Sequence, residues 1–290
     1  DESTELPEWQ ANHRKWEDLT ENEKSWEDYR MAIYAAMVES IDRNLGRLKQ
    51  ELMRTGQWEN TLFLFMSDNG ANPMERSGRG HMLPWKPKCG MSQGTEWAAV
   101  SNTPFRWYKQ NNFMGGVATP FIVHWPAGLK AKQWDNTPSH VVDIMPTLLE
   151  ISGGEYPETI RGEKVGEMVG ISLAPLLAGQ KVEREDPIFY SYVGNNGLWD
   201  GRYKIVSNRG GPWELFDMDS DPVENVDIAA AHPERVQAMG KEWYRIGNQI
   251  KVHAKSRAPR NDTATPWGRK SSEEHPDWKD KKPPLSLPNE

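Results

Sequence analysis

The stretch of sequence that decides the fold is residues 61–70, TLFLFMSDNG. A run of apolar, mostly β-favouring residues ends at Ser67, and Gly70 closes the stretch. An apolar run bounded by turn residues predicts a short buried strand of a parallel sheet. In open α/β sheets, ligands bind beyond the carboxyl ends of the strands. We therefore expect Asp68 and Asn69 to face a ligand.

The chemistry of Asp68 and Asn69 favours a metal ion as that ligand. A carboxylate and an amide carbonyl are hard oxygen donors of the kind that calcium and magnesium prefer. The alternative is that Asn69 and Gly70 form only a turn, which Asp68 caps. From these residues alone both interpretations stay open.

The elements around this stretch predict an α/β fold with a doubly wound, mostly parallel sheet. Residues 29–55 carry apolar side chains at helical steps of three and four, and Gly56 ends the pattern. A helix followed closely by a strand is the repeating unit of such a sheet. A second short strand is predicted at residues 120–125, PFIVHW, before Pro126.

Lys109 is the candidate cation of the site. It lies shortly before Gly115 and Gly116, which mark a tight backbone approach, and before the second strand. A cation beside Asp68 would hold an anionic group of a substrate. Taken alone, Lys109 also fits an ordinary solvated lysine.

The loop predicted at residues 72–99 contains Cys89, the single cysteine of the chain. No residue near Cys89 in the sequence would activate its thiol, so we interpret it as a plain loop thiol. A single cysteine also excludes an internal disulfide. A helix at residues 139–152 has His140 at its start, where packing at the helix N-terminus is favoured over metal ligation.

The C-terminal part of the chain changes character after residue 184. Short strands at residues 188–192, 203–207 and 213–216 predict an antiparallel sheet, and Pro233 opens a helix over residues 232–250. The acidic run DMDSD at 217–221 is interpreted as a turn. We therefore divide the chain into a polar arm (1–28), an α/β part (29–183), a small antiparallel-sheet-plus-helix subdomain (184–253) and a polar tail (254–290).

Composition excludes several classes of function. The net charge is −7, from 35 Lys and Arg against 42 Asp and Glu, and basic blocks are absent. The chain therefore has no feature typical of nucleic-acid binding. No apolar run approaches the ~20 residues that a membrane-spanning helix requires.

Four segments together resemble the C-terminal half of a type I sulfatase, of the arylsulfatase type, in the alkaline-phosphatase-like superfamily. They are MAIYAAMVESIDRNLGRL with NTLFLFMSDNG, SNTPFRWYK with NNFMGGVATPFIVHWPAG, SHVVDIMPTLLEISG with GISLAPLLAG, and DGRYKIV with GPWELFDMDSDPVENVDIAAAHPERV. Each segment is a weak match alone, and the four stand in the family's order.

The resemblance implies a metal-dependent sulfuric ester hydrolase. By this likeness Asp68 and Asn69 correspond to the later pair of ligands for calcium, with magnesium as the other candidate. Lys109 corresponds to the lysine that contacts the sulfate. A cation and an ammonium at these positions would stabilise charge that builds on sulfate oxygens. The implied substrate is a sulfate-ester small molecule or a sulfated glycan, and the implied location is the periplasm or the cell exterior.

The departures from the family pattern are equally informative. The C/S-x-P-x-R motif that becomes formylglycine is absent, as are the early aspartate pair and the mid-chain histidine. Phe113 and Met114 replace the family's usual His-Glu or Tyr-Glu, which would loosen the support around Lys109. The simplest interpretation is that residues 1–290 are the second half of a longer sulfatase, whose missing first half carries the nucleophile.

Two alternatives remain from the sequence. One is a phosphonate or phosphate monoester hydrolase of the same superfamily, which shares the metal site. The other is a non-catalytic remnant that binds a glycan or a protein partner.

Overall fold

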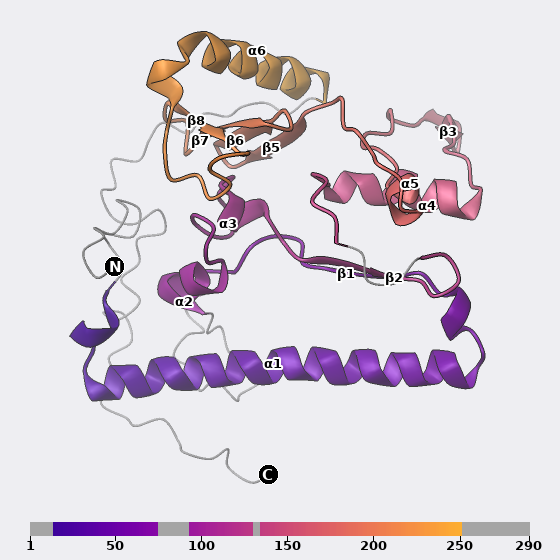
Figure 1. Cartoon of the computed structure of the whole chain (residues 1–290), viewed down its shortest axis with the longest axis horizontal. Helices are drawn as coiled ribbons and strands as arrows, with labels where there is room; N and C mark the ends of the chain where they lie inside the picture. The colour runs from indigo at the N-terminus through magenta and orange to yellow at the C-terminus, as the bar shows by residue number, and fades with distance from the viewer. Residues whose placement is uncertain (1–13, 75–92, 130–133, 251–290) are drawn as a thin grey trace.

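A computed structural model of the chain describes residues 14–74, 93–129 and 134–250 (Figure 1). The long helix α1 lies along one side, the pair β1–β2 lies between α1 and α4, and the sheet β5–β8 with α6 lies at the opposite end. The helices and strands are α1 Glu21–Arg54, β1 Phe63–Met66, α2 Gly94–Ser101, α3 Met114–Val117, β2 Phe121–His124, α4 Ile144–Ser152, β3 Thr159–Ile160, β4 Glu163–Lys164, α5 Ala174–Leu177, β5 Ile188–Tyr192, β6 Asn195–Trp199, β7 Tyr203–Ser207, β8 Trp213–Asp217 and α6 Pro233–Gln249.

Helix α1 begins at Glu21, earlier than the predicted start at residue 29, because a capping box fixes its first turn. The Thr20 hydroxyl accepts from the backbone N–H of Glu23, and the Glu23 carboxylate accepts from the backbone N–H of Thr20 at 2.9 Å. Two contacts join α2 to the start of α1 and to the short turn of helix that precedes it. The indole of Trp97 donates to the Glu27 carboxylate at 2.9 Å, and the rings of Trp16 and Trp97 meet edge to face.

The strand pair β1–β2 differs from the predicted buried parallel sheet. The two strands pair antiparallel, with Phe63 opposite His124 and Met66 opposite Phe121. Every strand pair within the described residues is antiparallel. Both strands of β1–β2 are also partly exposed, because none of the described residues covers their outward side chains. Strand position was predictable from composition, whereas pairing direction was not.

The predicted antiparallel sheet at the C-terminal end is confirmed, with the strand order β5-β6-β7-β8. Helix α6 covers one of its faces through Trp243, which is buried with Leu198, Ile205 and Leu215. The Trp243 indole stacks on Phe189 at a ring-centroid distance of 5.2 Å and donates to the Tyr190 carbonyl at 3.0 Å. The run DMDSD ends β8 and continues as the predicted turn.

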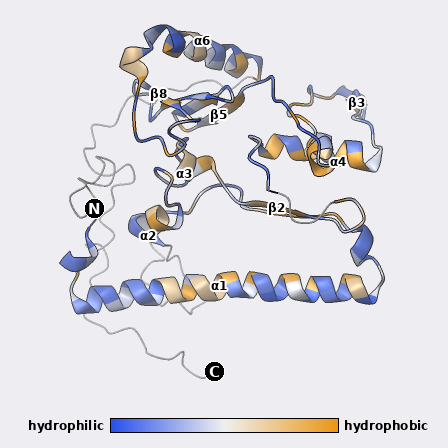
Figure 2. Cartoon of the chain, in the orientation of Figure 1, coloured by the Kyte–Doolittle hydropathy of each residue, from blue (hydrophilic) through white to orange (hydrophobic). Residues whose placement is uncertain are grey.

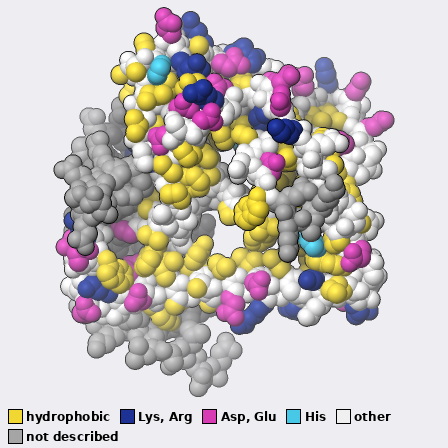
Figure 3. Space-filling model, in the orientation of Figure 1, with side chains coloured by type: hydrophobic (Ala, Val, Ile, Leu, Met, Phe, Trp, Pro, Cys, Tyr) yellow, Lys and Arg dark blue, Asp and Glu magenta, His cyan; other side chains and the backbone are white. Residues whose placement is uncertain are grey.

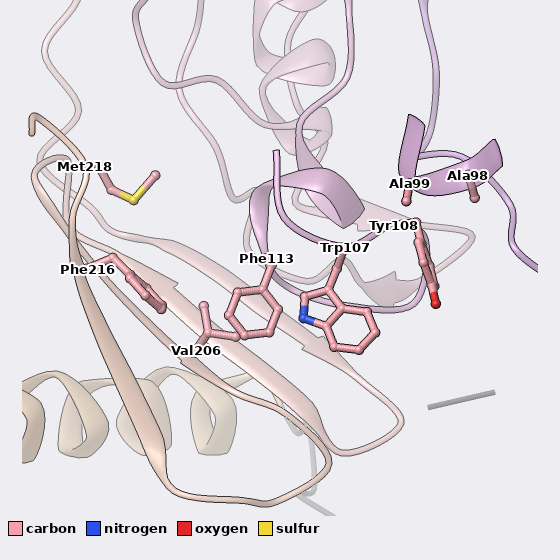
Figure 4. Close-up of a cluster of buried hydrophobic side chains, with 8 residues drawn as sticks. All are labelled: Ala98, Ala99, Trp107, Tyr108, Phe113, Val206, Phe216 and Met218. Carbon is pink, nitrogen blue, oxygen red and sulfur yellow. The ribbon is translucent and has the colours of Figure 1, made fainter. Parts of the chain in front are cut away.

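The other face of the sheet packs against the segment that contains Lys109. Phe113 inserts between Trp107 on one side and Val206 and Phe216 of the sheet on the other (Figure 4). Phe113 is 1% exposed and Phe216 is fully buried. This cluster joins the sheet to α2 through Ala98 and Ala99, which lie in the stretch predicted as a loop. Cys89 lies outside the described residues.

The middle of the molecule carries large apolar side chains that no described residue covers. They run along α1 and across β1–β2, and they include Met37 (61% exposed), Val38, Ile41, Leu48, Phe65, Phe121 and Ile122 (58%). Figure 2 shows hydrophobic residues along α1 and along β2. Figure 3 shows an opening above α1 whose rim is rich in hydrophobic side chains. Solvated apolar surface of this extent marks an interaction face or an aggregation liability.

We expect the isolated chain to self-associate and to unfold without a sharp transition. The uncovered apolar face and the short open strand pair both favour association with another chain. Light scattering and thermal melting of purified residues 1–290 would measure this. A monomer with a cooperative melt would show instead that the chain is a self-sufficient unit.

None of the helices in the described part of the chain combines the length and apolar character that crossing a membrane requires.

Candidate active site at the end of strand β1

The loop after β1 and the turn before β2 pack backbone against backbone. The Gly70 N–H donates to the Gly116 carbonyl at 3.0 Å, and the Lys109 N–H donates to the Ala71 carbonyl at 3.1 Å. A Cβ atom at Gly70 would lie 1.8 Å from the Gly115 carbonyl oxygen. Only glycine therefore fits there, and the predicted tight approach at Gly115 is confirmed.

This contact brings the three predicted site residues to one open pocket. Asp68, Asn69 and Lys109 all line it, together with residues of β2, the start of α4 and β5. Asp68 is exposed, and Asn69 and Lys109 are partly buried. The structure thus places the candidate carboxylate, amide and ammonium, separated by about forty residues in sequence, on the same cavity.

The donor set of the loop fits part of a site for a hard cation. Neither the Asp68 carboxylate nor the Lys109 ammonium has a hydrogen-bond partner among the described residues. The loop itself is held by other atoms, because Thr119 donates to the Ser67 carbonyl at 3.0 Å and the Ser67 hydroxyl donates to the Asn69 carbonyl at 2.9 Å. Asp68 and Asn69 would supply two of the six to eight oxygens that calcium takes.

Within the described ranges, no three or more His, Cys, Asp or Glu side chains cluster closely enough to hold a metal ion.

His140 lines the same pocket but works as the predicted packing group. Its Nδ1 accepts from the Val142 N–H at 3.3 Å, and its own backbone N–H donates to Asp143 at 2.7 Å. Burial lowers the pKa of His140, and the nearby Asp143 carboxylate partly opposes this shift. Asp143 is fully buried and ion-paired with Arg184, and it accepts from the Ile171 N–H at 2.9 Å. These contacts fasten the start of α4 to the segments on either side of α5.

Two buried polar residues that hold the Lys109 segment were not predicted from the sequence. Glu224, in the loop after β8, is fully buried, and its carboxylate accepts from the Met114 N–H at 2.5 Å and from the Lys204 ammonium at 2.7 Å. Asn195 is 2% exposed, and its amide donates to the Gln110 carbonyl at 2.6 Å. A lysine between apolar residues in YKIVS was the one available signal, because a lysine on a core face requires a charge partner.

Burial governs the electrostatics of the Lys204–Glu224 pair. It lowers the pKa of Lys204 and raises the pKa of Glu224, and the charge of each partner opposes the shift of the other. Arg106 adds a further cation nearby, since its guanidinium pairs with Glu214 at 2.8 Å and lies over the Phe113 ring. Phe113 packs in the core and the Met114 N–H donates to Glu224, whereas the predicted loosening of the support around Lys109 stays a prediction.

Comparisons with known proteins identify the family of the chain. A family model described as "Sulfatase" matches residues 4–154, and one described as "N-sulphoglucosamine sulphohydrolase, C-terminal" matches residues 104–242. The first match covers more than half of the chain. The chain belongs to the sulfatase family.

Two curated relatives show how much of a sulfatase the chain represents. An uncharacterized sulfatase of Schizosaccharomyces pombe is 28% identical over 258 residues, which are 79% of this chain and 45% of that protein. The arylsulfatase of Klebsiella aerogenes is 29% identical over 188 residues, or 60% of this chain and 40% of the relative. The chain thus spans less than half the length of either protein.

The likeness to solved structures shows the fold. The structure of Ps i-CgsB in complex with k-i-k-neocarrahexaose matches with a TM-score of 0.59 and 22% identity, over 80% of this chain and 45% of that one. A second, solved with its substrate D-glucosamine-2-N,6-O-disulfate, matches with a TM-score of 0.52 and 22% identity, over 75% and 40% of the two chains. The chain therefore has the α/β fold of these proteins, with a small antiparallel sheet at its C-terminal end.

Proposed function

We propose that this chain is the part of a sulfuric ester hydrolase that holds the metal ion and the sulfate group. The observation that carries the proposal is the backbone contact between the loop after β1 and the Gly115–Gly116 turn, with Asp68, Asn69 and Lys109 on one pocket. Family membership supports the same reaction class.

In this proposal each residue has a separate role. Asp68 and Asn69 hold a bivalent cation, calcium in preference to magnesium, through their side-chain oxygens. Bound there, the cation would draw negative charge from the sulfate oxygens. The Lys109 ammonium contacts the sulfate and stabilises the charge that develops on its oxygens as the ester bond breaks.

We further propose that the nucleophile, a formylglycine, belongs to residues outside this chain that complete the same domain. The chain spans 45% and 40% of the two relatives, and its sequence has no C/S-x-P-x-R motif. The pocket volume of 1840 Å³ exceeds the ~300–1,000 Å³ of ordinary small-molecule sites, as expected of a pocket that lacks one wall. The uncovered faces of α1 and β1–β2 would pack against the residues that complete the domain. Strands β1 and β2 would then belong to a larger and mostly parallel sheet.

Residues 29–183 would belong to the main α/β domain, and residues 184–253 would form the small subdomain, between the polar arm and tail. The substrate class would be sulfate esters, including sulfated glycans, because the proteins of two solved relatives were crystallised with a neocarrahexaose and a sulfated glucosamine. Export to the periplasm or the exterior would suit such substrates.

A comparison of ester classes tests the reaction. In the catalytically complete protein we expect turnover of 4-nitrophenyl sulfate to exceed that of 4-nitrophenyl phosphate and of a phenyl phosphonate ester, measured as kcat/KM with calcium present. Preference for a phosphorus ester would move the protein to the phosphonate or phosphate hydrolases. Binding of a sulfated oligosaccharide without turnover of any ester would identify a non-catalytic remnant.

A further inference from the structure

We propose that Glu224 and Asn195 are positioning residues for Lys109, acting from the C-terminal sheet on the loop that carries the ammonium. This inference rests on the proposed function, because it assigns the support of that same site. Neither residue is among the side chains that line the pocket, so both would act through the backbone that they hold.

The loop around Lys109 has a backbone that needs outside support. Trp107 (φ 65°) and Gln110 (φ 76°) both lie in the left-handed region, one on each side of Lys109. Residues other than glycine keep this conformation only where their surroundings fix it, and such sites cluster where function demands a particular geometry. Lys109 therefore projects from a strained loop whose shape depends on its contacts.

Asn195 holds the first half of this loop. Its side-chain amide donates to the carbonyl of Gln110, at 2.6 Å, while its Oδ1 accepts from the Arg209 N–H at 2.9 Å. Both ends of the amide are therefore used, which fixes its orientation.

Glu224 holds the second half. One carboxylate oxygen accepts from the Met114 N–H, at the first residue of α3, and the other accepts from Lys204 of β7. Glu224 itself has a left-handed backbone (φ 62°) and no exposed surface. A buried acceptor in a constrained loop can hold the glycine turn at one distance from the sheet, and through the turn it sets where Lys109 projects.

The consequence for catalysis follows from geometry. A displacement of about 1 Å in a group that contacts the reacting centre lowers turnover by up to ~10²-fold. Removing the hydrogen bond to the Gln110 carbonyl or to the Met114 N–H should therefore reduce kcat, although no contact with the substrate is lost. A purely structural pair would instead affect only the fraction of protein that is folded.

Two double variants of the complete protein separate these roles. Lys204→Met/Glu224→Gln and Lys204→Met/Glu224→Met both remove the buried charges, but only glutamine keeps an oxygen that accepts from the Met114 N–H. We expect the glutamine variant to stay within about threefold of the parent in kcat. We expect the methionine variant to lose ~10- to 100-fold, with faster hydrogen exchange at the Met114 amide.

A variant of Asn195 provides a second test, with a matched control. Asn195→Asp keeps the oxygen that faces Arg209 but replaces the amide donor, so we expect a comparable loss in kcat. The control is Asn196→Ala, which changes the next residue, whose side-chain oxygen accepts from the hydroxyl of the exposed Ser191 at 3.4 Å, and it should leave kcat unchanged.

The outcomes separate the inference from the proposed function. Equal kcat in the two double variants, with equal exchange at Met114, would overturn the role of Glu224. If neither double variant folds, parental kcat in Asn195→Asp would overturn the inference. If the parent turns over no sulfate ester, the proposed function fails, and the exchange rates at Met114 alone decide whether Glu224 holds the turn.

Discussion

Replacing Asp68 by alanine in the complete protein is expected to abolish metal binding and sulfatase turnover together. Asp68 is the charged oxygen donor next to Asn69 in the loop that lines the pocket, and it is exposed and has no hydrogen-bond partner among the described residues. A hard cation held by few carboxylates depends on each of them. Asn69→Ala removes only a neutral carbonyl, so the metal should be weakened less.

Lys109→Ala is expected to keep the metal and to lower kcat by ~10²–10³-fold. An ammonium repels a cation, so it cannot hold one. Removing its contact with the reacting anion should lower kcat by the amount that is typical for loss of one charge-assisted catalytic contact. The contrast between the two variants is therefore the informative result: one loses metal and rate, the other loses rate alone.

Elemental analysis beside steady-state kinetics measures both effects. Asp219→Ala is a matched control, because this aspartate is 71% exposed in the turn after β8 and should change neither metal content nor kcat. Full calcium content in Asp68→Ala would show that SDNG is only a turn. Normal turnover in Lys109→Ala would remove that residue from the site.

The three candidate residues could be proposed from the sequence because the chemistry of each is local in the chain. Asp68 and Asn69 follow an apolar run that predicts a strand, and Gly115 and Gly116 predict a close backbone approach. Each of the two segments that line the pocket therefore has a recognisable pattern of its own. The contact between the two segments was not predictable from either alone. It depends on the Gly70–Gly116 and Lys109–Ala71 hydrogen bonds, which join segments far apart in the chain.

The fold was predictable to a similar depth. Side-chain periodicity located α1 and the strands, but strand polarity depends on the neighbour and not on the strand's own pattern. Strand β6, NNGLW, escaped prediction because asparagine and glycine disfavour strands, and its place is fixed by pairing with both β5 and β7. Glu224 escaped because an acidic loop residue resembles a solvated one until its lysine partner is seen.

The chain by itself is expected to show no turnover of an aryl sulfate. Asp68, Asn69 and Lys109 bind and stabilise charge, but sulfate ester cleavage also needs an attacking group, and the sequence holds no motif that would form formylglycine. A positioned cation and an ammonium supply only part of a rate that a covalent nucleophile makes possible. The release of 4-nitrophenol from its sulfate, compared with a blank without protein, measures the difference.

The control for this experiment is Lys109→Ala in the same chain. A contaminating sulfatase would give the same rate in both preparations, whereas a genuine activity of residues 1–290 would fall in the variant. Turnover that scales with the concentration of the chain and disappears in Lys109→Ala would therefore contradict the expectation. In that case a group among residues 1–290 attacks the sulfur, and the nucleophile has to be sought within the pocket after β1 and not in a preceding half of the domain.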